Sequence, residues 1–452
     1  MKQTNIKNLV IGFGKAGKTL AKTLASKGEE VILVEQSKTM YGGTCINVGC
    51  IPSKKLLNLS TQGLDFEKAM QAKNDLISKL NTKNYKMIAD ESKARVVDGT
   101  AVFRSNYQVD ILDETGTAIE HITAERIFIN TGATPVIPNI KGISESKNII
   151  TSTEALNLAS KPSSITIIGA GYIGLEMATM LNNFGIKINV IDTSTAFLPR
   201  EDKDIADKIL NDMMSVGINI CIGCTINEIK DTSTAVELKF TTREGKDLSL
   251  QSDKILVCTG RKPNIDSLGI HNTGIAIDSR GAITVDEHLQ TKVPNIYALG
   301  DVHGGLQFTY TSLDDFRIVL DHLYGTKTKK LSDRTTVPYS VFLTPPLSSV
   351  GINETTAKQK NIPYNLFSLE CSNIPNAHIL GQTKGILKVL THPETNTILG
   401  AVLYSANSFE LINTISLAIN QGIPYTVLRD AIYTHPTMNE SFNDLFKAAV
   451  KK

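Results

Sequence analysis

The fold is decided by the stretch Gly12-Phe13-Gly14-Lys15-Ala16-Gly17-Lys18-Thr19, which follows the apolar run Leu9-Val10-Ile11. Its glycines satisfy both the dinucleotide-binding pattern G-x-G-x-x-G and the P-loop pattern G-x4-G-K-[ST]. A dinucleotide-binding turn also needs an acidic residue about 20 positions on, at the end of the second strand, to hold the ribose. Glu35 ends the apolar run Val31 to Val34. We therefore expect Gly12, Gly14, Gly17 and Glu35 to bind a dinucleotide, with the P-loop as the alternative.

The same pattern occurs a second time. The apolar run Ile165 to Ile168 leads into Gly169-Ala170-Gly171-Tyr172-Ile173-Gly174, and the strand-like run Ile186 to Ile191 ends in Asp192. The first glycine and the acid lie 23 positions apart in both copies. One G-x-G-x-x-G is weak evidence, but two copies with one spacing predict two dinucleotide-binding units. Gly169, Gly171, Gly174 and Asp192 are the expected contacts of the second nucleotide.

A third motif carries cysteines, in Gly42-Gly43-Thr44-Cys45-Ile46-Asn47-Val48-Gly49-Cys50-Ile51-Pro52-Ser53-Lys54. Pro52 suits the first turn of a helix, so Cys50 should lie at a helix N-terminus, which lowers a thiol pKa. A zinc site shared with Cys221-x2-Cys224 and a pair of inert buried cysteines are the alternatives. Cys221 and Cys224 lie in an alternating, strand-like run in which positions three apart face opposite ways, and we expect them to be packing residues.

The composition excludes several classes of protein. A chain of 452 residues is long enough for two to four domains. Its 47 basic and 45 acidic residues leave a net charge of +2, which indicates neither a nucleic-acid partner nor a membrane surface. The start of the chain lacks a signal-peptide pattern, and nowhere do 18 apolar residues run together, so a cytoplasmic protein is expected. In that compartment six cysteines do not form a structural disulfide framework.

The stretch Gly42 to Lys54 closely resembles the redox-active segment of the FAD-dependent pyridine nucleotide-disulfide oxidoreductases. The resemblance implies an α/β fold with two Rossmann-like domains, for FAD and for NAD(P), and a C-terminal α+β dimerisation domain. The implied boundaries are 1–148 and 264–333 for the FAD domain, 149–263 for the NAD(P) domain and 334–452 for the dimerisation domain. It also implies a two-electron relay from nicotinamide through flavin to a Cys45–Cys50 disulfide.

Further site residues follow from the resemblance. Thr131-Gly132 and Gly260 lie in turns of the Thr-Gly type, and Asp301 would contact the flavin ribityl chain. Lys54 and Glu176 would form an ion pair near the flavin. His435 would be the acid–base for Cys45 of the partner subunit, with Glu440 orienting its imidazole. The expected cofactor contacts also include Gly43 and Thr44, and no metal site is expected. The alternatives are a plain strand end at Thr131, an N-cap at Asp301 and a capping box made by Thr437 and Glu440.

Several stretches narrow the resemblance, among them Gly304 to Arg317, Leu198 to Asp202 and Val337 to Phe342. They are similar to the bacterial reactive-chlorine-resistance flavoproteins, described as hypothiocyanous acid reductases and copper(II) reductases. We expect a homodimer with a shared active site that reduces a small oxidant, with NADH preferred over NADPH because Asp192 would repel a 2′-phosphate. The alternatives are a dihydrolipoamide dehydrogenase, a mercuric or other disulfide reductase, and a non-catalytic nucleotide-binding redox sensor.

Overall fold

The computed structural model describes residues 1–447 and 449–450, and the chain passes repeatedly between two units. The first unit comprises 1–138, 150–161 and 259–334, and the second comprises 139–149, 162–258 and 335–452. The two-residue strand β8 (Ile149–Ile150) lies where the chain crosses from the second unit into the first. The predicted three-domain boundaries stay a prediction.

A seven-stranded sheet with the order β3-β2-β1-β6-β5-β4, and with β17 beside β6, forms the centre of the first unit. Strands β3, β2, β1, β6 and β17 run parallel, and β4 and β5 form an antiparallel extension. The apolar runs at the ends of β1 and β2 are buried, as expected for parallel strands covered on both faces. The strands are β1 (Lys2–Ile11), β2 (Val31–Glu35), β3 (Ala94–Asp98), β4 (Thr100–Phe103), β5 (Gln108–Leu112), β6 (Ala118–Ile129) and β17 (Ile296–Ala298).

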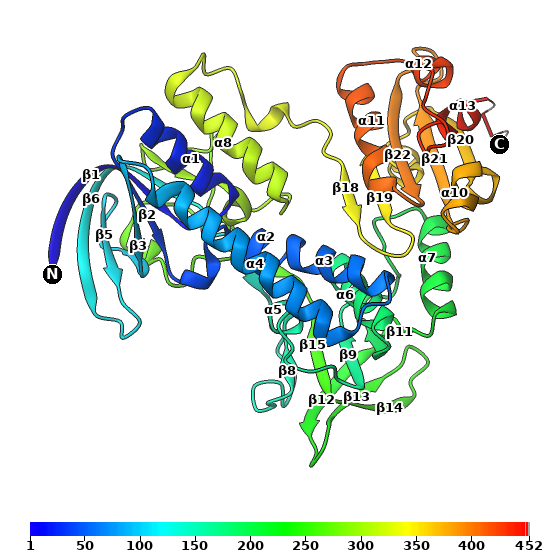
Figure 1. Ribbon diagram of the computed structural model, residues 1–452, viewed down its shortest axis with the longest axis horizontal. Helices are drawn as coiled ribbons and strands as arrows, with labels where there is room; N and C mark the ends of the chain where they lie inside the picture. Colours follow the sequence, from blue (N-terminus) through cyan, green and yellow to red (C-terminus); the bar gives the residue numbers. More distant parts are fainter. Residues whose placement is uncertain (448, 451–452) are drawn as a thin grey trace. The chain divides into compact units, whose positions relative to one another are not determined.

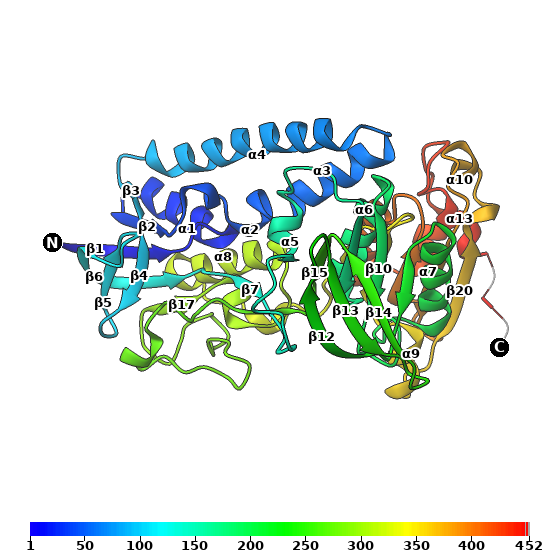
Figure 2. The ribbon, with the colours of Figure 1, turned by 90° about the horizontal axis from the view of Figure 1, so that it is seen from below.

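Helices pack against this sheet and against one another. Helices α1 and α8 run side by side (Figure 1), and the 24-residue helix α4 lies along α1 and α3 (Figure 2). Asp65 caps α4 by accepting hydrogen bonds from the backbone N–H groups of Glu67 and Lys68. The helices are α1 (Lys15–Ser26), α2 (Gly43–Asn47), α3 (Cys50–Thr61), α4 (Phe66–Ala89), α5 (Ser152–Ala155) and α8 (Thr309–Tyr324), and a ribbon pairs β7 (Ala133–Pro135) with β16 (Arg261–Pro263).

The second unit begins with another parallel sheet, in which β11, β10, β9 and β15 are neighbours. It carries the second glycine-rich turn between β9 and α6, so both predicted dinucleotide units have the expected strand–turn–helix order. The elements are β9 (Ser164–Ile168), α6 (Tyr172–Asn183), β10 (Lys187–Ile191), α7 (Lys203–Ser215), β11 (Asn219–Cys221) and β15 (Lys254–Val257), with an antiparallel meander of β12 (Thr225–Asp231), β13 (Val236–Thr241) and β14 (Asp247–Ser252).

The C-terminal part of the second unit is an antiparallel sheet with the order β18-β19-β22-β21-β20. Helix α11 packs against β19 and β22 (Figure 1). The predicted change to short strands followed by helices is therefore present. The elements are β18 (Tyr339–Val341), β19 (Leu347–Gly351), α9 (Glu354–Gln359), β20 (Asn365–Glu370), α10 (Pro375–Ile379), β21 (Ile386–Thr391), β22 (Ile398–Tyr404), α11 (Ser408–Asn420), α12 (Tyr425–Asp430) and α13 (Ser441–Leu445).

We expected the side chains of Cys221 and Cys224 to face opposite ways, and this expectation is wrong. Cys221 and Cys224 do pack in the apolar core beside β12 and β13, but their side chains do not face opposite ways. Strand β11 ends at Cys221, and Gly223 has a φ of 71°, which turns the chain. The two Sγ atoms lie 2.7 Å apart. The alternation rule fails here because the strand ends before the second cysteine.

Candidate active site

The first glycine-rich turn is closed against Asn130, which the sequence did not single out. A Cβ on Gly12 would lie 2.4 Å from the carbonyl oxygen of Asn130, and one on Gly14 would lie 2.4 Å from Asn130 Oδ1. The same Oδ1 accepts a hydrogen bond from the Gly17 N–H at 2.9 Å. Only glycine fits these positions, so the turn packs directly on Asn130, and this tight turn is the shape that a dinucleotide-binding motif requires.

Glu35 and Lys18 decide between the two interpretations of this turn. Glu35 ends β2 and accepts hydrogen bonds from the Phe13 N–H at 3.0 Å and the Ser37 N–H at 3.3 Å, while burial raises the pKa of its carboxyl. Lys18 is buried and donates to Asn84 Oδ1 at 2.6 Å, whereas a P-loop lysine must reach phosphates. The P-loop alternative is therefore wrong, and Glu35 lies where a ribose-binding acid belongs.

The remaining expected flavin contacts lie in the first unit. A Cβ on Gly43 would lie 2.7 Å from the Cα of Gly14, so the cysteine segment and the first glycine-rich turn are in backbone contact, and Thr44 follows in α2. The Thr131 hydroxyl donates to the carbonyl of Asn264 at 2.7 Å. A Cβ on Gly132 or Gly260 would meet no atom within 4 Å.

The two cysteines of the motif are joined by a hydrogen bond. Cys50 begins α3 as expected, and the hydrogen bond from Cys50 lowers the pKa of Cys45 to about 6; burial opposes this, while Thr309 and the charges of Lys18 and Lys54 add to it. The pKa of Cys50 is raised, first by the same hydrogen bond. When the reduced pair loses one proton, the negative charge therefore rests on Cys45. The helix N-terminus alone had led us to expect the charge on Cys50.

The alkylation of Cys45 should follow this charge. In the reduced protein, iodoacetamide should modify Cys45 at a rate that falls by half near pH 6, because only the thiolate reacts. Cys50→Ser should move that midpoint upward, because it removes the hydrogen bond that contributes most to the lowered pKa. Peptide mass spectrometry across pH 5 to 9 measures both midpoints. Midpoints near the ordinary thiol pKa of about 8.5 in both proteins would contradict the assignment.

Asp301 is not the N-cap of a following helix. It lies in the 3-10 turn Gly300–His303, whose N-cap is Leu299, and α8 begins only at Thr309 after its N-cap Phe308. Burial raises the pKa of Asp301, and the positive charge of Arg261 opposes this. The Arg261 guanidinium also acts on Cys50 and donates to the carbonyl of Ala133. Arg261 therefore joins the candidate site, although the sequence marked only the turn before it.

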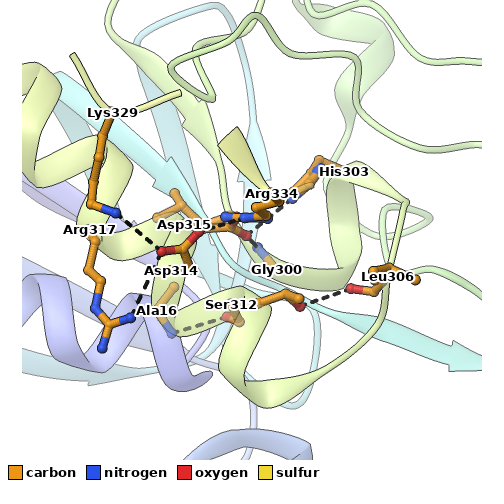
Figure 3. A network of polar contacts seen from close by, with 12 residues as sticks. Ala16, Gly300, His303, Leu306, Ser312, Asp314, Asp315, Arg317, Lys329 and Arg334 are labelled. Carbon is orange, nitrogen blue, oxygen red and sulfur yellow. Dashed lines mark hydrogen bonds and ion pairs between the residues drawn. The ribbon is translucent and has the colours of Figure 1, made fainter. Parts of the chain in front are cut away.

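Both ends of the turn that carries Asp301 are held by one buried carboxylate, that of Asp315 in α8 (Figure 3). Asp315 Oδ2 accepts the Gly300 N–H at 2.6 Å and lies 3.1 Å from His303 Nε2, while Oδ1 pairs with Arg334. Burial alone would raise the pKa of Asp315, but His303 and Arg334 lower it below its usual range. Asp315 thus stays ionised and orients the segment that contains Asp301.

We expect Asp315→Asn to weaken FAD binding about tenfold or more, since it removes charge-assisted hydrogen bonds worth about 1.5–3 kcal/mol. The flavin-to-protein ratio of the purified protein and an FAD titration of the apoprotein measure the effect. Asp314→Asn is the matched control, because Asp314 also pairs with Arg334 while its other ion pairs, with Arg317 and Lys329, lie outside the turn. Equal flavin affinity in the two variants would contradict the positioning role.

In the second unit, the second glycine-rich turn repeats the first. A Cβ on Gly174 would lie 2.1 Å from the carbonyl oxygen of Gly169, and one on Gly171 would meet no atom within 4 Å. The carboxylate of Asp192, directly after β10, accepts hydrogen bonds from the Ala170 N–H and, at 2.6 Å, from the Ser194 N–H. The acid and the turn are thus joined, as a ribose-binding acid requires.

His435 and Glu440 form a pair near the C-terminus. His435 Nδ1 lies 2.8 Å from Glu440 Oε2, and the histidine side chain is 74% exposed. Thr437 Oγ1 accepts the Glu440 N–H at 3.4 Å, which is one half of the capping box, but helix α13 begins only at Ser441 and Glu440 Oε2 is bound to His435. The imidazole is oriented and reaches solvent, and Ile432, just before it, is fully exposed.

Lys54 and Glu176 lie in different units, so their ion pair stays a prediction. Lys54 lies in α3, where its charge lowers the pKa of Cys45. Glu176 lies in α6 and accepts the Phe342 N–H at 2.8 Å.

Among the described residues, no group of three or more His, Cys, Asp or Glu side chains is placed to hold a metal ion. No helix in the described ranges is long and apolar enough to cross a membrane.

Comparison with known proteins decides the family. Residues 6–315 match the pyridine nucleotide-disulphide oxidoreductases, and residues 337–446 match the dimerisation domain of the same family. The chain belongs to this family. Membership confirms the predicted fold class and implies a flavoprotein that uses FAD and a nicotinamide nucleotide, and the dimerisation domain indicates a homodimer. Which nicotinamide nucleotide this oxidoreductase uses does not follow from membership.

Relatives within the family differ in activity. The probable pyridine nucleotide-disulfide oxidoreductase RclA of Escherichia coli is 44% identical over 97% of this chain and 98% of its own length. A dihydrolipoyl dehydrogenase of Buchnera aphidicola is 32% identical (96% and 94% covered), and a mercuric reductase of Lysinibacillus sphaericus is 30% identical (97% and 81%). The solved Cu(II) complex of the HOCl-induced flavoprotein disulfide reductase RclA from Escherichia coli has a TM-score of 0.94 and 44% identity, with 98% of this chain and 99% of that one covered.

Proposed function

We propose that this oxidoreductase reduces hypothiocyanous acid at the expense of NADH, in defence against oxidants. The observation that carries the proposal is the Cys45 thiol, whose pKa is lowered to about 6 by the Cys50 hydrogen bond and two lysine charges. The similarity of this chain, over almost its whole length, to an HOCl-induced disulfide reductase supports a role in oxidant defence.

The residues present fit the two cofactors. The Gly12, Gly14 and Gly17 turn with Glu35 suits FAD, because the positions facing Asn130 and the neighbouring backbone leave no room for a Cβ. The Gly169, Gly171 and Gly174 turn with Asp192 suits the nicotinamide nucleotide. When bound, the flavin supplies two-electron exchange between the nicotinamide and the Cys45–Cys50 disulfide.

The protein's own residues do the sulfur chemistry. The Cys45 thiolate attacks the sulfur of hypothiocyanous acid, forming Cys45–S–SCN and releasing hydroxide, which takes a proton to become water. Cys50 then attacks Cys45 Sγ, expels thiocyanate and closes the disulfide, losing its own proton. The partner subunit's His435, oriented by Glu440, would move these protons, and its exposed ring suits that role.

An acceptor screen tests the proposal. Purified flavoprotein should oxidise NADH faster with hypothiocyanous acid than with Cu(II), lipoamide, glutathione disulfide or Hg(II). Copper(II) reduction is the second candidate, because a relative was solved as its Cu(II) complex and because thiolates stabilise the Cu(I) product. Fast turnover with lipoamide and negligible turnover with hypothiocyanous acid would restore dihydrolipoamide dehydrogenase as the function.

Coenzyme choice provides a separate prediction. Asp192 would accept hydrogen bonds from a ribose 2′-OH and repel a 2′-phosphate, and no arginine follows before Arg200. We therefore expect kcat/KM with NADH to exceed that with NADPH by about tenfold, and Asp192→Ala to narrow the ratio. Initial rates with both nucleotides measure it. A kcat/KM with NADPH equal to or above that with NADH would refute the prediction.

A further inference from the structure

Cys221 and Cys224 form a second sulfur pair, separate in sequence from the Cys45–Cys50 motif. Their Sγ atoms are 2.7 Å apart, within about 0.7 Å of the bonded distance of about 2.05 Å. Gly223, with its φ of 71°, makes the tight turn that brings them together.

The pair sits beside the turn that carries Asp192. The Asp192 N–H donates to the carbonyl of Cys221 at 2.9 Å, and the Cys224 N–H donates to the carbonyl of Asp192 at 2.9 Å. The Gly223 N–H donates to the carbonyl of Ser194 at 2.7 Å. Residues 221–224 and 192–194 are therefore joined by three backbone hydrogen bonds, and a change in one segment reaches the other.

The two sulfurs differ in access. Cys221 is half-buried, whereas Cys224 is 2% exposed. Burial, followed by the hydrogen bond and charge of Cys221, raises the pKa of Cys224 to about 12, so Cys224 keeps its proton. Cys221 is thus the sulfur that an oxidant reaches, and Cys224 is the thiol placed to resolve the product.

We propose that Cys221 and Cys224 are a second, reversible redox pair that hypochlorous acid and similar electrophiles oxidise to a disulfide, which stiffens the Asp192 turn. Cys221 sulfur attacks chlorine, forming an S–Cl bond, and the hydroxide that leaves takes the Cys221 proton to become water. Cys224 sulfur then displaces chloride, forms the S–S bond and loses its proton. In sum, two thiols give up two electrons and two protons, and hypochlorous acid becomes chloride and water. A small dithiol reverses the reaction by exchange.

The disulfide should tighten nucleotide binding. Because it fixes a turn already hydrogen-bonded to Asp192, less conformational freedom is lost when the nucleotide binds. We expect the KM for NADH to fall about two- to fivefold on oxidation. This effect rests on the proposed role of Asp192, whereas formation of the disulfide does not rest on the proposed function.

Peptide mapping tests the disulfide directly. Trypsin should release both cysteines in one peptide, 209–230, which has no internal Lys or Arg and none of the other four cysteines. The reduced holoprotein is treated with about three equivalents of hypochlorous acid or diamide per chain, enough to oxidise both the Cys45–Cys50 and the Cys221–Cys224 pairs, and is then denatured and alkylated. Peptide 209–230 should lack alkyl groups and be lighter by two hydrogen atoms, and dithiothreitol should restore both thiols. Cys371 should stay alkylated throughout.

Two variants and one kinetic measurement complete the test. Cys221→Ser should keep one alkylated thiol in the peptide, whereas in Cys224→Ser the oxidised Cys221 should hydrolyse to a sulfenic acid because no thiol resolves it. In neither variant should the peptide lose two hydrogen atoms or the KM for NADH respond to oxidant. If both thiols remain alkylated under conditions that convert Cys45–Cys50 to the disulfide, the second redox pair does not exist. If the disulfide forms and the KM for NADH stays the same, its coupling to Asp192 is refuted. Neither result depends on whether hypothiocyanous acid is the substrate.

Discussion

His435→Ala is expected to lower kcat with hypothiocyanous acid by about two to four orders of magnitude, which is the usual contribution of a positioned acid–base group. Glu440 holds the imidazole at 2.8 Å from Nδ1, and in the proposed mechanism the other ring nitrogen would exchange protons with the sulfur pair of the partner subunit. Steady-state rates at saturating NADH measure the loss.

A matched variant separates orientation from proton transfer. Glu440→Gln keeps a hydrogen-bonding oxygen beside Nδ1 but removes its charge, so it should lower kcat less than His435→Ala. Flavin reduction by NADH in a single turnover should be unchanged in both variants, because neither residue belongs to the nucleotide-binding turns. A His435→Ala enzyme with kcat within threefold of the parent would remove His435 from the mechanism.

Lys388→Met is expected to lower the free energy of unfolding by about 3–5 kcal/mol, as removing one partner of a buried ion pair does. Lys388, 2% exposed in β21, lies 3.1 Å from Asp202 Oδ2, 2.9 Å from Asp204 Oδ2 and 2.9 Å from Glu354 Oε2. The variant removes the buried positive charge that lies between Asp202 and Glu354, and the remaining cation, the exposed Lys358 at 3.7 Å from Glu354 Oε1, does not reach the buried position of Lys388. Guanidinium unfolding of the holoprotein measures the change.

A surface lysine of the same unit provides the control. Lys208 pairs with Glu370 at 3.1 Å, but both side chains are exposed, so Lys208→Met should cost about 1 kcal/mol or less. Equal losses in the two variants would contradict the role of burial.

The stability that Lys388 contributes should depend on pH. Burial works to raise the pKa of Glu354, but hydrogen bonds from Tyr364 and Lys388 lower it to about 2. This contribution is complete above the unfolded pKa of about 4.3 and is lost as the pH falls toward 2. The free energy of unfolding should therefore differ less between pH 6 and pH 3 in Lys388→Met than in the parent protein. An equal difference in the two proteins would contradict the pairing.

Local patterns predicted the two nucleotide-binding units because their signals are short-range. Gly12, Gly169 and the acids that follow them are set by strand, turn and helix over some 25 residues, and the structure has each where the spacing predicts it. The cysteine motif likewise begins its helix at Cys50. The distribution of charge between Cys45 and Cys50 escaped prediction, because it depends first on the hydrogen bond between the two sulfurs and then on Thr309 and Lys18, which come from other elements.

Long-range partners left no local signal. Asn130 supports the first glycine-rich turn, which lies more than 110 residues earlier in the chain. Asp315 contacts His303, before it in the sequence, and Arg334, after it. Cys224 meets Cys221 only because Gly223 takes a positive φ, which alternation cannot reveal. The acidic partners of Lys388 lie at positions 202, 204 and 354, so no local pattern around position 388 predicts its buried ion pairs.

The central claim is a two-electron relay that ends at a sulfur electrophile, and its stoichiometry tests that claim most directly. Purified enzyme is mixed with excess NADH and a measured amount of hypothiocyanous acid, and both NADH consumed and thiocyanate released are counted. The account predicts one NADH and one thiocyanate per oxidant molecule, with no turnover above background in Cys45→Ser. NADH oxidation that continues at the full rate in Cys45→Ser, or that releases no thiocyanate, would contradict it.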